Sequence, residues 1–501
     1  MEITMWYQRT VFYEIYVPSF CDSNGDGIGD LQGIISKIPY LSELGIKGIW
    51  LTPFYPSPRV DNGYDISNYY DVDKTFGTME DFKHLLERAH EYGIRVIIDV
   101  VINHTSNQHP WFLESKKSKE NTYRDYYIWE EKPKNNWESF FAGSAWEYEK
   151  ETNEYYYHAF SKEQVCLNYS NPRVKEEIIQ VLKFWLDLGV DGFRFDVINF
   201  LKMQRDKWPD NPYENGKQLH KYDKNQPGIL KFIEELKSFV SNWNDKFLLG
   251  EIGEDYLEDM LPYVGKEKLD ACFNFNIGSI ENFDLKKIYE ELVKCEKHQI
   301  VPTLFFSTHD MKRHFSRLCK EQINHAKLLA FMMLTLKGIP FLYQGEEIPT
   351  KDFRPKSIEE IQDIQGRLWY NNAIKQGFNK EEAFALAYQN TRDFSRSLLE
   401  WKDEDLNEDF YQFYQTMIAF RNENEILQTG NYDFIALEDF VLSYRRTSGN
   451  QSITFYLNFG ETEVLLPKGY QKVLGTQEES EVLKPMNAVA LCLGKDESLK
   501  L

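Results

Sequence analysis

The chain lacks the features that mark secreted, membrane-spanning and disulfide-stabilised proteins. Cysteine is rare, with six residues in 501, and no two cysteines form a CxxC pair. The most apolar stretch, Leu328 to Leu336, is too short to span a bilayer. The start, Met1 to Thr4, has neither the basic head nor the apolar run of a secretion signal. We therefore expect reduced thiols and a cytoplasmic location.

Positive charge is also in short supply. Lysine and arginine number 58, whereas aspartate and glutamate number 79, which gives a formal net charge of −21. A surface that acidic repels nucleic acid and anionic lipid, so we expect neither a nucleic acid nor a membrane as a partner. Aromatic residues, in contrast, are abundant at 15%. Rings in that number either fill large cores or offer flat apolar faces to a ligand such as a sugar.

The dominant pattern is a short apolar strand followed by an amphipathic helix. Eight strands that alternate with helices predict an α/β fold, and specifically a closed (β/α)8 TIM barrel. The strands are expected at Val11–Val17, Gly48–Leu51, Arg95–Val101, Gly192–Asp196, Phe247–Gly250, Cys272–Phe275, Val301–Phe306 and Gly338–Leu342. An open doubly wound sheet is the alternative, but no glycine-rich phosphate loop follows the first strand.

Two segments interrupt this alternation. Residues 104–170 are polar, rich in Asn, Trp and Tyr and without a helical period, which predicts a small domain inserted after strand three. From residue 429 only short strands are expected, which predicts a C-terminal antiparallel β-sandwich. The predicted domains are therefore the barrel in two parts, 1–103 and 171–428, the inserted domain, 104–170, and the C-terminal β-domain, 429–501.

Acidic and histidine residues recur where four of the predicted strands end, which is where barrels of this kind hold catalytic groups. Singly, each is more often a helix cap, an ion pair or a core residue. Three carboxylates that face one cavity repel one another, so their coincidence favours a functional site. A cation beside a carboxylate keeps it ionised, as a nucleophile requires. The strand ends read Asp99-Val-Val-Ile-Asn-His104, Gly192-Phe-Arg-Phe-Asp196, Gly250-Glu251 and His309-Asp310.

These motifs, in this order, resemble those of the α-amylase superfamily of glycoside hydrolases (glycoside hydrolase family 13), in its exo-acting oligo-1,6-glucosidase and α-glucosidase branch. The resemblance covers essentially the whole chain. It implies a glycosidase without an organic cofactor that acts on small oligosaccharides as a monomer or weak homo-oligomer. Supporting segments are Ile49-Trp-Leu-Thr-Pro53, Asp61-Asn-Gly-Tyr-Asp-Ile-Ser67, Gly338-Ile-Pro-Phe-Leu-Tyr-Gln-Gly-Glu-Glu347 and Thr391-Arg-Asp-Phe-Ser-Arg396.

The resemblance also implies a role for each site residue. Asp196 is the expected nucleophile and Glu251 the expected general acid and base, a pair that stands roughly 5 Å apart in retaining enzymes. Asp310 is expected to bind ring hydroxyls and stabilise the transition state. The remaining substrate-binding residues are expected to be His104, His309 and Arg194 around the glucose, Tyr64 stacked on its apolar face, and Asp61 paired with Arg396 at its non-reducing end.

A loop near the start of the chain has the spacing of a metal site. In Asp22-Ser-Asn24-Gly-Asp26-Gly27-Ile28-Gly-Asp30, oxygen ligands alternate and a glycine stands sixth, as in Ca²⁺ loops. The alternative is an Asx-rich turn without metal. The resemblance implies a structural Ca²⁺, with Mg²⁺ as the alternative. The implied ligands are Asp22, Asn24, Asp26, the Ile28 carbonyl and Asp30.

Two positions bear on the substrate. The family reads Gln-Pro-Asp-Leu-Asn where this chain has Gln164-Val165-Cys166-Leu167-Asn168, so a carboxylate is lost at the rim. Val197, directly after the predicted nucleophile, resembles enzymes that cleave α-1,6 bonds; a contact of that size is worth only about 1–3 kcal/mol and therefore gives a bias.

Several functions stay open from the sequence. Isomaltose-type α-1,6 hydrolysis is favoured. Cleavage of α-1,4 maltosides, sucrose or trehalose 6-phosphate is the alternative. A transglucosidase or isomerase shares the same glucosyl-enzyme and differs only in the acceptor. A non-enzymatic interaction subunit related to these enzymes is disfavoured, because its relatives carry a membrane anchor and have lost catalytic residues.

Overall fold

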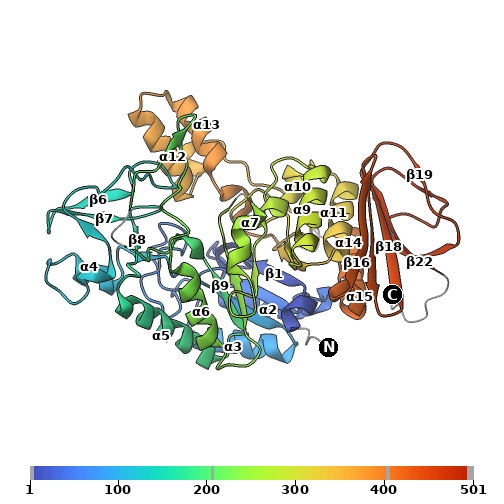
Figure 1. Cartoon of the computed structure of the whole chain (residues 1–501), viewed down its shortest axis with the longest axis horizontal. Helices are drawn as coiled ribbons and strands as arrows, with labels where there is room; N and C mark the ends of the chain where they lie inside the picture. Colours follow the sequence, from blue (N-terminus) through green and yellow to red (C-terminus); the bar gives the residue numbers. More distant parts are fainter. Residues whose placement is uncertain (1–4, 205–207, 255, 402–406, 494–501) are drawn as a thin grey trace.

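The computed structural model describes residues 5–204, 208–254, 256–401 and 407–493; Met1 to Thr4 lie outside the described residues. Eight parallel strands form the centre of the molecule, in the order β13-β12-β9-β3-β2-β1-β15-β14 (Figure 1). In chain order they are β1 (Phe12–Ile15), β2 (Gly48–Leu51), β3 (Arg95–Val100), β9 (Gly192–Phe195), β12 (Phe247–Gly250), β13 (Ala271–Cys272), β14 (Thr303–Leu304) and β15 (Ile339–Tyr343).

The barrel is closed by a side chain. No backbone pairing joins β13 to β14 in the described sheet. Instead, the Thr303 hydroxyl donates to the Cys272 carbonyl at 3.1 Å and accepts the Asn274 N–H at 2.9 Å. The eight strands are therefore one continuous ring of hydrogen bonds, with a seam that depends on a single hydroxyl.

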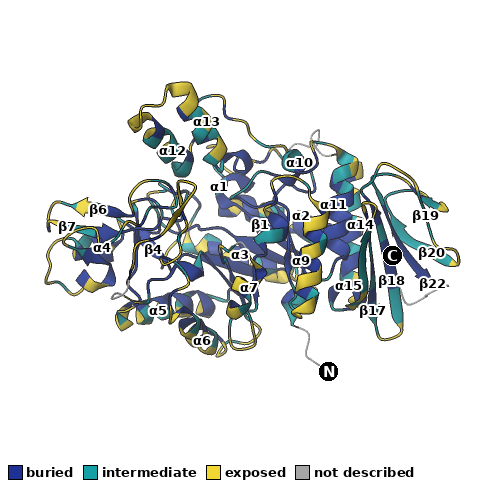
Figure 2. Ribbon diagram, turned by 45° about the horizontal axis from the view of Figure 1, so that its top comes forward, coloured by how far each residue is buried: buried dark blue, intermediate teal, exposed yellow. Residues whose placement is uncertain are grey.

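Helices pack around the barrel because each buries apolar side chains; most have one apolar face, whereas α11 is buried at consecutive positions from Leu328 to Thr335. The long ones are α2 (Leu31–Leu44), α3 (Met79–Glu91), α5 (Pro172–Leu188), α6 (Ile229–Val240), α9 (Leu285–Lys297), α11 (Ile323–Thr335) and α14 (Glu408–Glu423). Local sequence sets their ends: the Asp30 carboxylate caps α2 by accepting the Gly33 N–H, and Gly189 ends α5 in a left-handed conformation. Their buried faces form one core with the strands, which Figure 2 shows as the dark blue centre.

The part of the chain that forms the barrel also contains short elements between its strands and long helices. They are α1 (Val17–Phe20), α7 (Leu257–Met260), α8 (Phe275–Gly278), α10 (His314–Arg317), α15 (Glu425–Gln428), the 3-10 turns η1 (Trp6–Arg9), η3 (Ile198–Phe200), η4 (Leu261–Tyr263), η5 (Ile358–Glu360) and η6 (Asp393–Ser395), and the hairpin β10 (Tyr213–Glu214) with β11 (Lys217–Gln218). The helices α12 (Ile364–Lys375) and α13 (Lys380–Asn390) project from the top of the molecule in Figures 1 and 2.

The segment after β3 folds as two small antiparallel sheets. One pairs β4 (His104–Ser106) with β8 (Gln164–Cys166), and the other has the order β5-β7-β6. Tryptophan and tyrosine rings of this segment form a separate core together with Trp208, which follows η3 in the chain and stacks on Trp137. The remaining elements are α4 (Pro110–Ser115), η2 (Arg124–Tyr126), β5 (Trp129–Glu130), β6 (Trp146–Glu149) and β7 (Glu154–Tyr157).

The C-terminal part is an antiparallel sheet in the order β16-β17-β18-β22-β20, at the right of Figure 1. Its strands are β16 (Asn431–Glu438), β17 (Val441–Ser448), β18 (Gln451–Asn458), β20 (Tyr470–Gly475) and β22 (Asn487–Leu493), with a small second sheet of β19 (Val464–Leu465) and β21 (Val482–Leu483). The predicted fold class is confirmed, including the insert after the third barrel strand. Among the described residues no helix is both long and apolar enough to cross a membrane.

Candidate active site

A cavity of about 230 Å³ opens at the C-terminal ends of the barrel strands. Three of the residues that line it are the predicted carboxylates on separate strand ends, which the fold brings together although they are far apart in the chain. The complete lining is Asp61, Tyr64, His104, Phe141, Phe160, Gln164, Asp196, Val197, Glu251, Asp310, Gln365 and Arg392.

One guanidinium connects two of the three carboxylates. Arg194 projects from β9 with 2% of its surface exposed, and its Nη1 lies 2.7 Å from Asp196 Oδ1. Its Nη2 donates to Glu251 Oε2. Nη1 also lies 2.9 Å from Asp99 Oδ1 on β3. Arg194 therefore lies behind the cavity wall and fixes the Asp196 and Glu251 carboxyl groups beside each other.

Burial opposes ionisation of both carboxyl groups and raises their pKa values. The pKa of Asp196 rises to about 6, because burial outweighs the attraction of Arg194 and the nearby Asp99 adds repulsion. The pKa of Glu251 rises to about 7 for the same main reason, with Arg194 again opposing the shift. Near neutral pH, Asp196 is therefore largely ionised while Glu251 retains a substantial protonated fraction.

The third carboxylate has the opposite electrostatic setting. Burial again opposes the charge on Asp310, but His309, Arg396 and Arg392 hold its pKa well below the ordinary value. His309 Nε2 lies 3.0 Å and Arg396 Nη2 2.7 Å from the carboxylate. Asp310 is therefore a permanent anion in the cavity. Its side chain is 33% exposed and so accessible to a ligand.

The predicted pairing of Asp61 with Arg396 is wrong. Asp61 Oδ1 pairs instead with Arg392 Nη2 at 2.5 Å, and Arg396 is held by Asp310 and by the His309 carbonyl. The two arginines flank η6, one at its start and one at its end. Arg392 also contacts Asp363 and lines the cavity, whereas Arg396 does not line it.

Histidine and tyrosine side chains form the floor of the cavity. His104 lies near Gln164, whose amide nitrogen also donates to Asp61 Oδ2 at 3.0 Å. Burial lowers the pKa of His104 to about 4, so His104 is neutral. The Tyr64 hydroxyl donates to Asp99 Oδ2 at 2.9 Å, and its ring stacks on His309.

This chain and known proteins share both sequence and architecture. The family model described as alpha amylase, catalytic domain, matches residues 14–430. The chain belongs to the alpha-amylase family of glycoside hydrolases.

Alpha-amylase family members of known name cover nearly all of this chain. Oligo-1,6-glucosidase of Parageobacillus thermoglucosidasius is 38% identical over 91% of each chain. Trehalose-6-phosphate hydrolase of Escherichia coli K12 is 34% identical over 90% of each. The crystal structure of trehalulose synthase MutB from Pseudomonas mesoacidophila MX-45 aligns with a TM-score of 0.91 at 30% identity, over 98% of this chain and 100% of that one.

Several residues of this alpha-amylase family site were not predicted as such. Arg392 and Gln164 belong to motifs visible in the sequence, yet nothing in those motifs shows which side chain faces the cavity. Phe141 and Phe160 come from the inserted segment and form part of the lining. Of the predicted residues, Arg194, His309 and Arg396 lie behind the lining carboxylates.

The Asp22–Asp30 loop has the chemistry of a hard-cation site but does not gather its carboxylates. Asp22 accepts the amides of Gly25 and Gly27, both at 2.7 Å, and these contacts lower its pKa. Asp26 Oδ1 accepts the Ile28 N–H, and Asp30 is occupied by Ser23 and by the α2 cap. The described residues contain no group of three or more His, Cys, Asp and Glu side chains placed to hold a metal. The oxygen donor set fits Ca²⁺, while the carboxylates face the loop amides.

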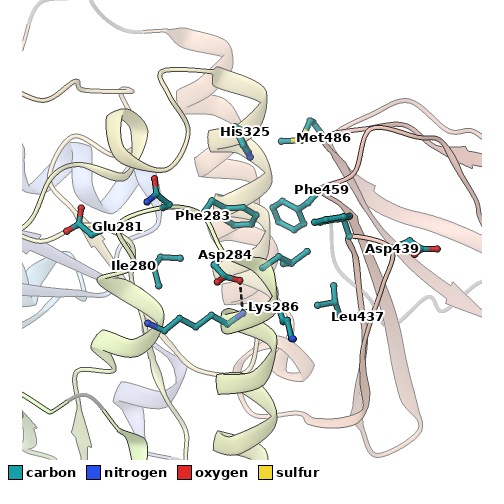
Figure 3. A pocket seen from close by; sticks show the side chains of 14 residues that line it. Ile280, Glu281, Phe283, Asp284, Lys286, His325, Leu437, Asp439, Phe459 and Met486 are labelled. Atoms are coloured by element: carbon teal, nitrogen blue, oxygen red, sulfur yellow. Dashed lines mark hydrogen bonds between the residues drawn. The ribbon is translucent and has the colours of Figure 1, made fainter.

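A larger hollow lies far from the carboxylates. It measures about 860 Å³ and separates the start of α9 from the C-terminal sheet (Figure 3). Phe283 and Phe459 stack across it with ring centroids 4.8 Å apart. The charged residues around it, such as Glu281 and Lys286, are exposed. Size alone therefore does not locate the catalytic chemistry in this molecule.

Proposed function

We propose that the protein is a retaining exo-α-glucosidase that hydrolyses terminal α-linked glucose from short oligosaccharides, with α-1,6 linkages favoured. The observation that carries this proposal is the single Arg194 guanidinium that holds Asp196 and Glu251 side by side in one small cavity. Two oxygens bound to neighbouring nitrogens of one guanidinium are necessarily close, which favours retention over inversion. The relatives named above support the substrate class.

In the first step Asp196 acts as the nucleophile. Its Oδ attacks the anomeric carbon and the glycosidic C–O bond breaks. Glu251 gives its proton to the departing oxygen, so the aglycone leaves as a neutral alcohol. The pKa values of about 6 and about 7 suit this division, because one group has to be ionised and the other protonated.

In the second step Glu251 takes a proton from water. The resulting hydroxide attacks the glucosyl-enzyme, releases glucose with its original configuration and returns Asp196 as a carboxylate. Asp310, as a permanent anion, stabilises the positive charge that develops at the ring. Arg194 stays protonated throughout and positions both carboxyl groups.

The closed end of the cavity supports exo action. Asp61 accepts hydrogen bonds from Arg392 and Gln164, and all three residues line the cavity. In this proposal they close the cavity behind the terminal glucose. In this proposal Tyr64 stacks on the glucose, His104 and His309 bind its hydroxyls, and Arg396 acts through Asp310. A cavity of about 230 Å³ is below the usual range of about 300–1,000 Å³ for larger ligands.

Linkage preference follows from Val197. This residue lines the cavity directly after the nucleophile and adopts a left-handed backbone with φ of 36°. Its fixed methyl groups limit how an aglycone can approach. Hydrolysis of α-1,4 maltosides, sucrose or trehalose 6-phosphate is the second candidate, since one relative is a trehalose-6-phosphate hydrolase.

The decisive experiment measures glucose release from isomaltose, panose, maltose, sucrose, trehalose and trehalose 6-phosphate. We expect isomaltose to be cleaved with the highest kcat/KM. Asp196→Asn should lower turnover on that substrate by at least about 10³-fold, because the carboxylate nucleophile is gone. Unchanged turnover by this variant would refute the mechanism, and a preference for maltose would refute only the linkage.

Transfer of glucose to a sugar is the competing reaction of the same intermediate. The architectural match to a trehalulose synthase keeps it open. Product analysis at high sugar concentration separates the two, because hydrolysis yields free glucose and transfer yields new disaccharides. If the protein forms neither free glucose nor new disaccharides, a non-enzymatic role becomes the better interpretation.

We propose a structural Ca²⁺, with Mg²⁺ as the alternative, in the Asp22–Asp30 loop. The ligands would be Asp22, Asn24, Asp26, the Ile28 carbonyl and Asp30, and the ion would supply charge neutralisation and loop rigidity only. Chelation should lower Tm without lowering kcat at a temperature where the protein remains folded. An Asp22→Ala variant should lack the Ca²⁺ dependence of Tm.

The remaining proposals concern the location of the protein, its oligomeric state and its division into domains. All six cysteines are buried, and thiols held in the core suit a reducing, cytoplasmic location. We propose a monomer or weak homo-oligomer, to be checked by sedimentation. We also propose 1–103 with 171–428, 104–170 and 429–501 as the division into barrel, substrate-rim domain and C-terminal domain.

A further inference from the structure

Glu14 is a buried carboxyl group on β1, directly beneath the active site. Its residue is 1% exposed and does not line the cavity. Its Oε1 accepts two hydrogen bonds from one residue: the backbone N–H of His309 at 3.1 Å and the His309 Nδ1 at 2.6 Å. Glu14 therefore holds His309 at both its backbone and its ring.

The other ring nitrogen of His309 faces the reaction. Nε2 lies 2.7 Å from the Tyr64 hydroxyl and 3.0 Å from Asp310 Oδ2. The rings of Tyr16 and Tyr64 stack on the imidazole at 5.7 and 5.4 Å. These contacts prevent the ring from turning, so Glu14 and Asp310 are connected through one fixed imidazole.

A count of protons assigns the charge of this ring. The single hydroxyl proton of Tyr64 goes to Asp99 Oδ2, and Arg194 Nη1 contacts both oxygens of that carboxylate. The Tyr64 oxygen then accepts from His309 Nε2, so Nε2 bears a proton. Burial raises the pKa of Glu14, whereas its contacts with His309 lower it. With Glu14 ionised, Oε1 has no proton to give, so Nδ1 donates to it as the backbone N–H does.

We propose that Glu14 is a positioning residue that keeps His309 doubly protonated, so that its Nε2 proton holds Asp310 ionised and oriented toward the sugar. This inference rests on the proposed function of Asp310 in the glucose subsite. Glu14 itself touches neither substrate nor lining, and it acts through His309.

The charges on every side of His309 are consistent with an imidazolium. Burial disfavours it, but Asp310 and Glu14 outweigh burial and raise its pKa to about 9. The other titratable groups that face this assembly are Tyr16, Tyr64, Tyr343, Asp99, Arg392, Arg396 and Arg194. The three arginines are each engaged with carboxylates, so none displaces Glu14 from its contact with the histidine.

The Glu14→Gln variant removes the negative charge of this side chain and keeps nearly the same size and shape. The amide oxygen can still accept the backbone N–H, but the negative charge that favours the imidazolium is lost. His309 should then lose its proton near neutral pH and Asp310 its oriented donor. We expect kcat/KM for the best glucoside at pH 7 to fall about 10- to 100-fold.

The pH profile of kcat/KM distinguishes this role from a structural one. In the wild type the alkaline limb reports Glu251, because His309 loses its proton only at higher pH. In Glu14→Gln the limb should move to lower pH by about one unit. Glu347→Gln is the matched control: Glu347 is also a buried carboxyl group, and it accepts the Tyr13 and Tyr40 hydroxyls away from the cavity.

A second measurement does not depend on activity. Because the folded pKa of His309, about 9, exceeds its ordinary 6.5, the stabilisation is complete below pH 6.5 and is lost as the pH rises through 9. Between pH 7 and 9, Tm should fall more steeply for the wild type than for Glu14→Gln. Glu347→Gln should keep the wild-type slope.

The outcomes separate the two proposals. A shifted limb and a flattened Tm slope in Glu14→Gln alone support the role of Glu14. If both properties match the wild type in folded Glu14→Gln, the role of Glu14 is refuted. A wild type that cleaves no glucoside refutes the proposed function, and the Tm slope then decides on Glu14 by itself.

Discussion

Arg194 and Arg421 are equally buried but have opposite surroundings. Arg194 contacts three carboxylates, which raise its pKa despite burial. Arg421, on α14, donates only to the carbonyls of residues 334, 336 and 338, and burial together with the nearby Arg446 lowers its pKa to about 9. Arg194 compensates the charges of the proposed catalytic carboxyl groups, and Arg421 satisfies backbone carbonyls at the junction with the C-terminal sheet.

At the junction between the barrel and the C-terminal sheet, arginine has a structural role. Arg446 on β17 donates to the carbonyl of Thr335 at the end of α11, of Leu427 in α15 and of Gly430 after α15. The C-terminal ends of helices carry partial negative charge, so they attract these cations without any carboxylate. The comparison teaches that a buried cation indicates a catalytic site when its partners are titratable groups that face a cavity.

The largest expected effect is on activity, at Arg194, which positions the proposed catalytic carboxyl groups. Arg194→Lys replaces the planar guanidinium, which has several N–H donors, with a single ammonium group. One ammonium group cannot bind Asp99, Asp196 and Glu251 together. We expect kcat/KM to fall about 10³-fold, measured on the preferred glucoside. Arg95→Lys, at a half-exposed arginine paired with Asp191, is the control. If kcat/KM fell less than tenfold in Arg194→Lys, the proposed difference between Arg194, which affects activity, and Arg421, which affects stability, would be contradicted.

The next effect is on stability at the junction arginine. Arg421→Met leaves the carbonyls of residues 334, 336 and 338 without their donor. We expect a loss of about 3–5 kcal/mol in the free energy of unfolding, measured by denaturant titration. The kcat of the folded fraction should equal that of the wild type. Arg421→Lys keeps a charge and should lose less; a variant with normal stability but reduced kcat would contradict the assignment.

A smaller effect concerns how the stability contribution of Asp196 in the cavity depends on pH. Since the folded pKa of Asp196, about 6, exceeds its ordinary 3.8, its stability contribution is present below pH 3.8 and lost as the pH rises through 6. Asp196→Asn should therefore gain stability relative to the wild type between pH 5 and 7.5, on the order of 1–3 kcal/mol. The exposed Asp187→Asn should show no such trend. A gain that shrinks with rising pH would contradict the sign.

The smallest effect concerns Cys166, where the family reads Asp. Lys202 is buried nearby, donates to the carbonyls of Phe200 and Asp223, and has a pKa lowered by burial. Cys166→Asp supplies a carboxylate partner and should raise Tm at pH 7 by an amount equivalent to about 1 kcal/mol. Cys166→Ser, without a charge, is the control. An equal gain in both variants would assign the effect to polarity.

The sequence predicted the fold because the barrel strands are continuous buried runs between capped helices. The carboxylates were predictable for the same reason, since they directly follow those runs. β16 is not evident from the sequence, because most of its residues are half-buried and neither face produces a clear alternation. The domain boundaries and the residue roles remain predictions.

The pairing inside the site could not be predicted. Arg392 and Arg396 flank one short turn, and only the fold decides which of them reaches Asp61. Glu14 gives no local signal either, because its partner His309 lies 295 residues away. Contacts between distant strand ends depend on the barrel register, which sequence patterns do not specify.

The Thr303 seam has a consequence for how the site moves. The proposed nucleophile Asp196 and the proposed acid Glu251 follow β9 and β12, which pair directly through their backbones. Asp310 follows β14, the strand that borders the seam. An opening of the seam would therefore move Asp310 relative to Asp196 and Glu251 and would leave the spacing between those two unchanged.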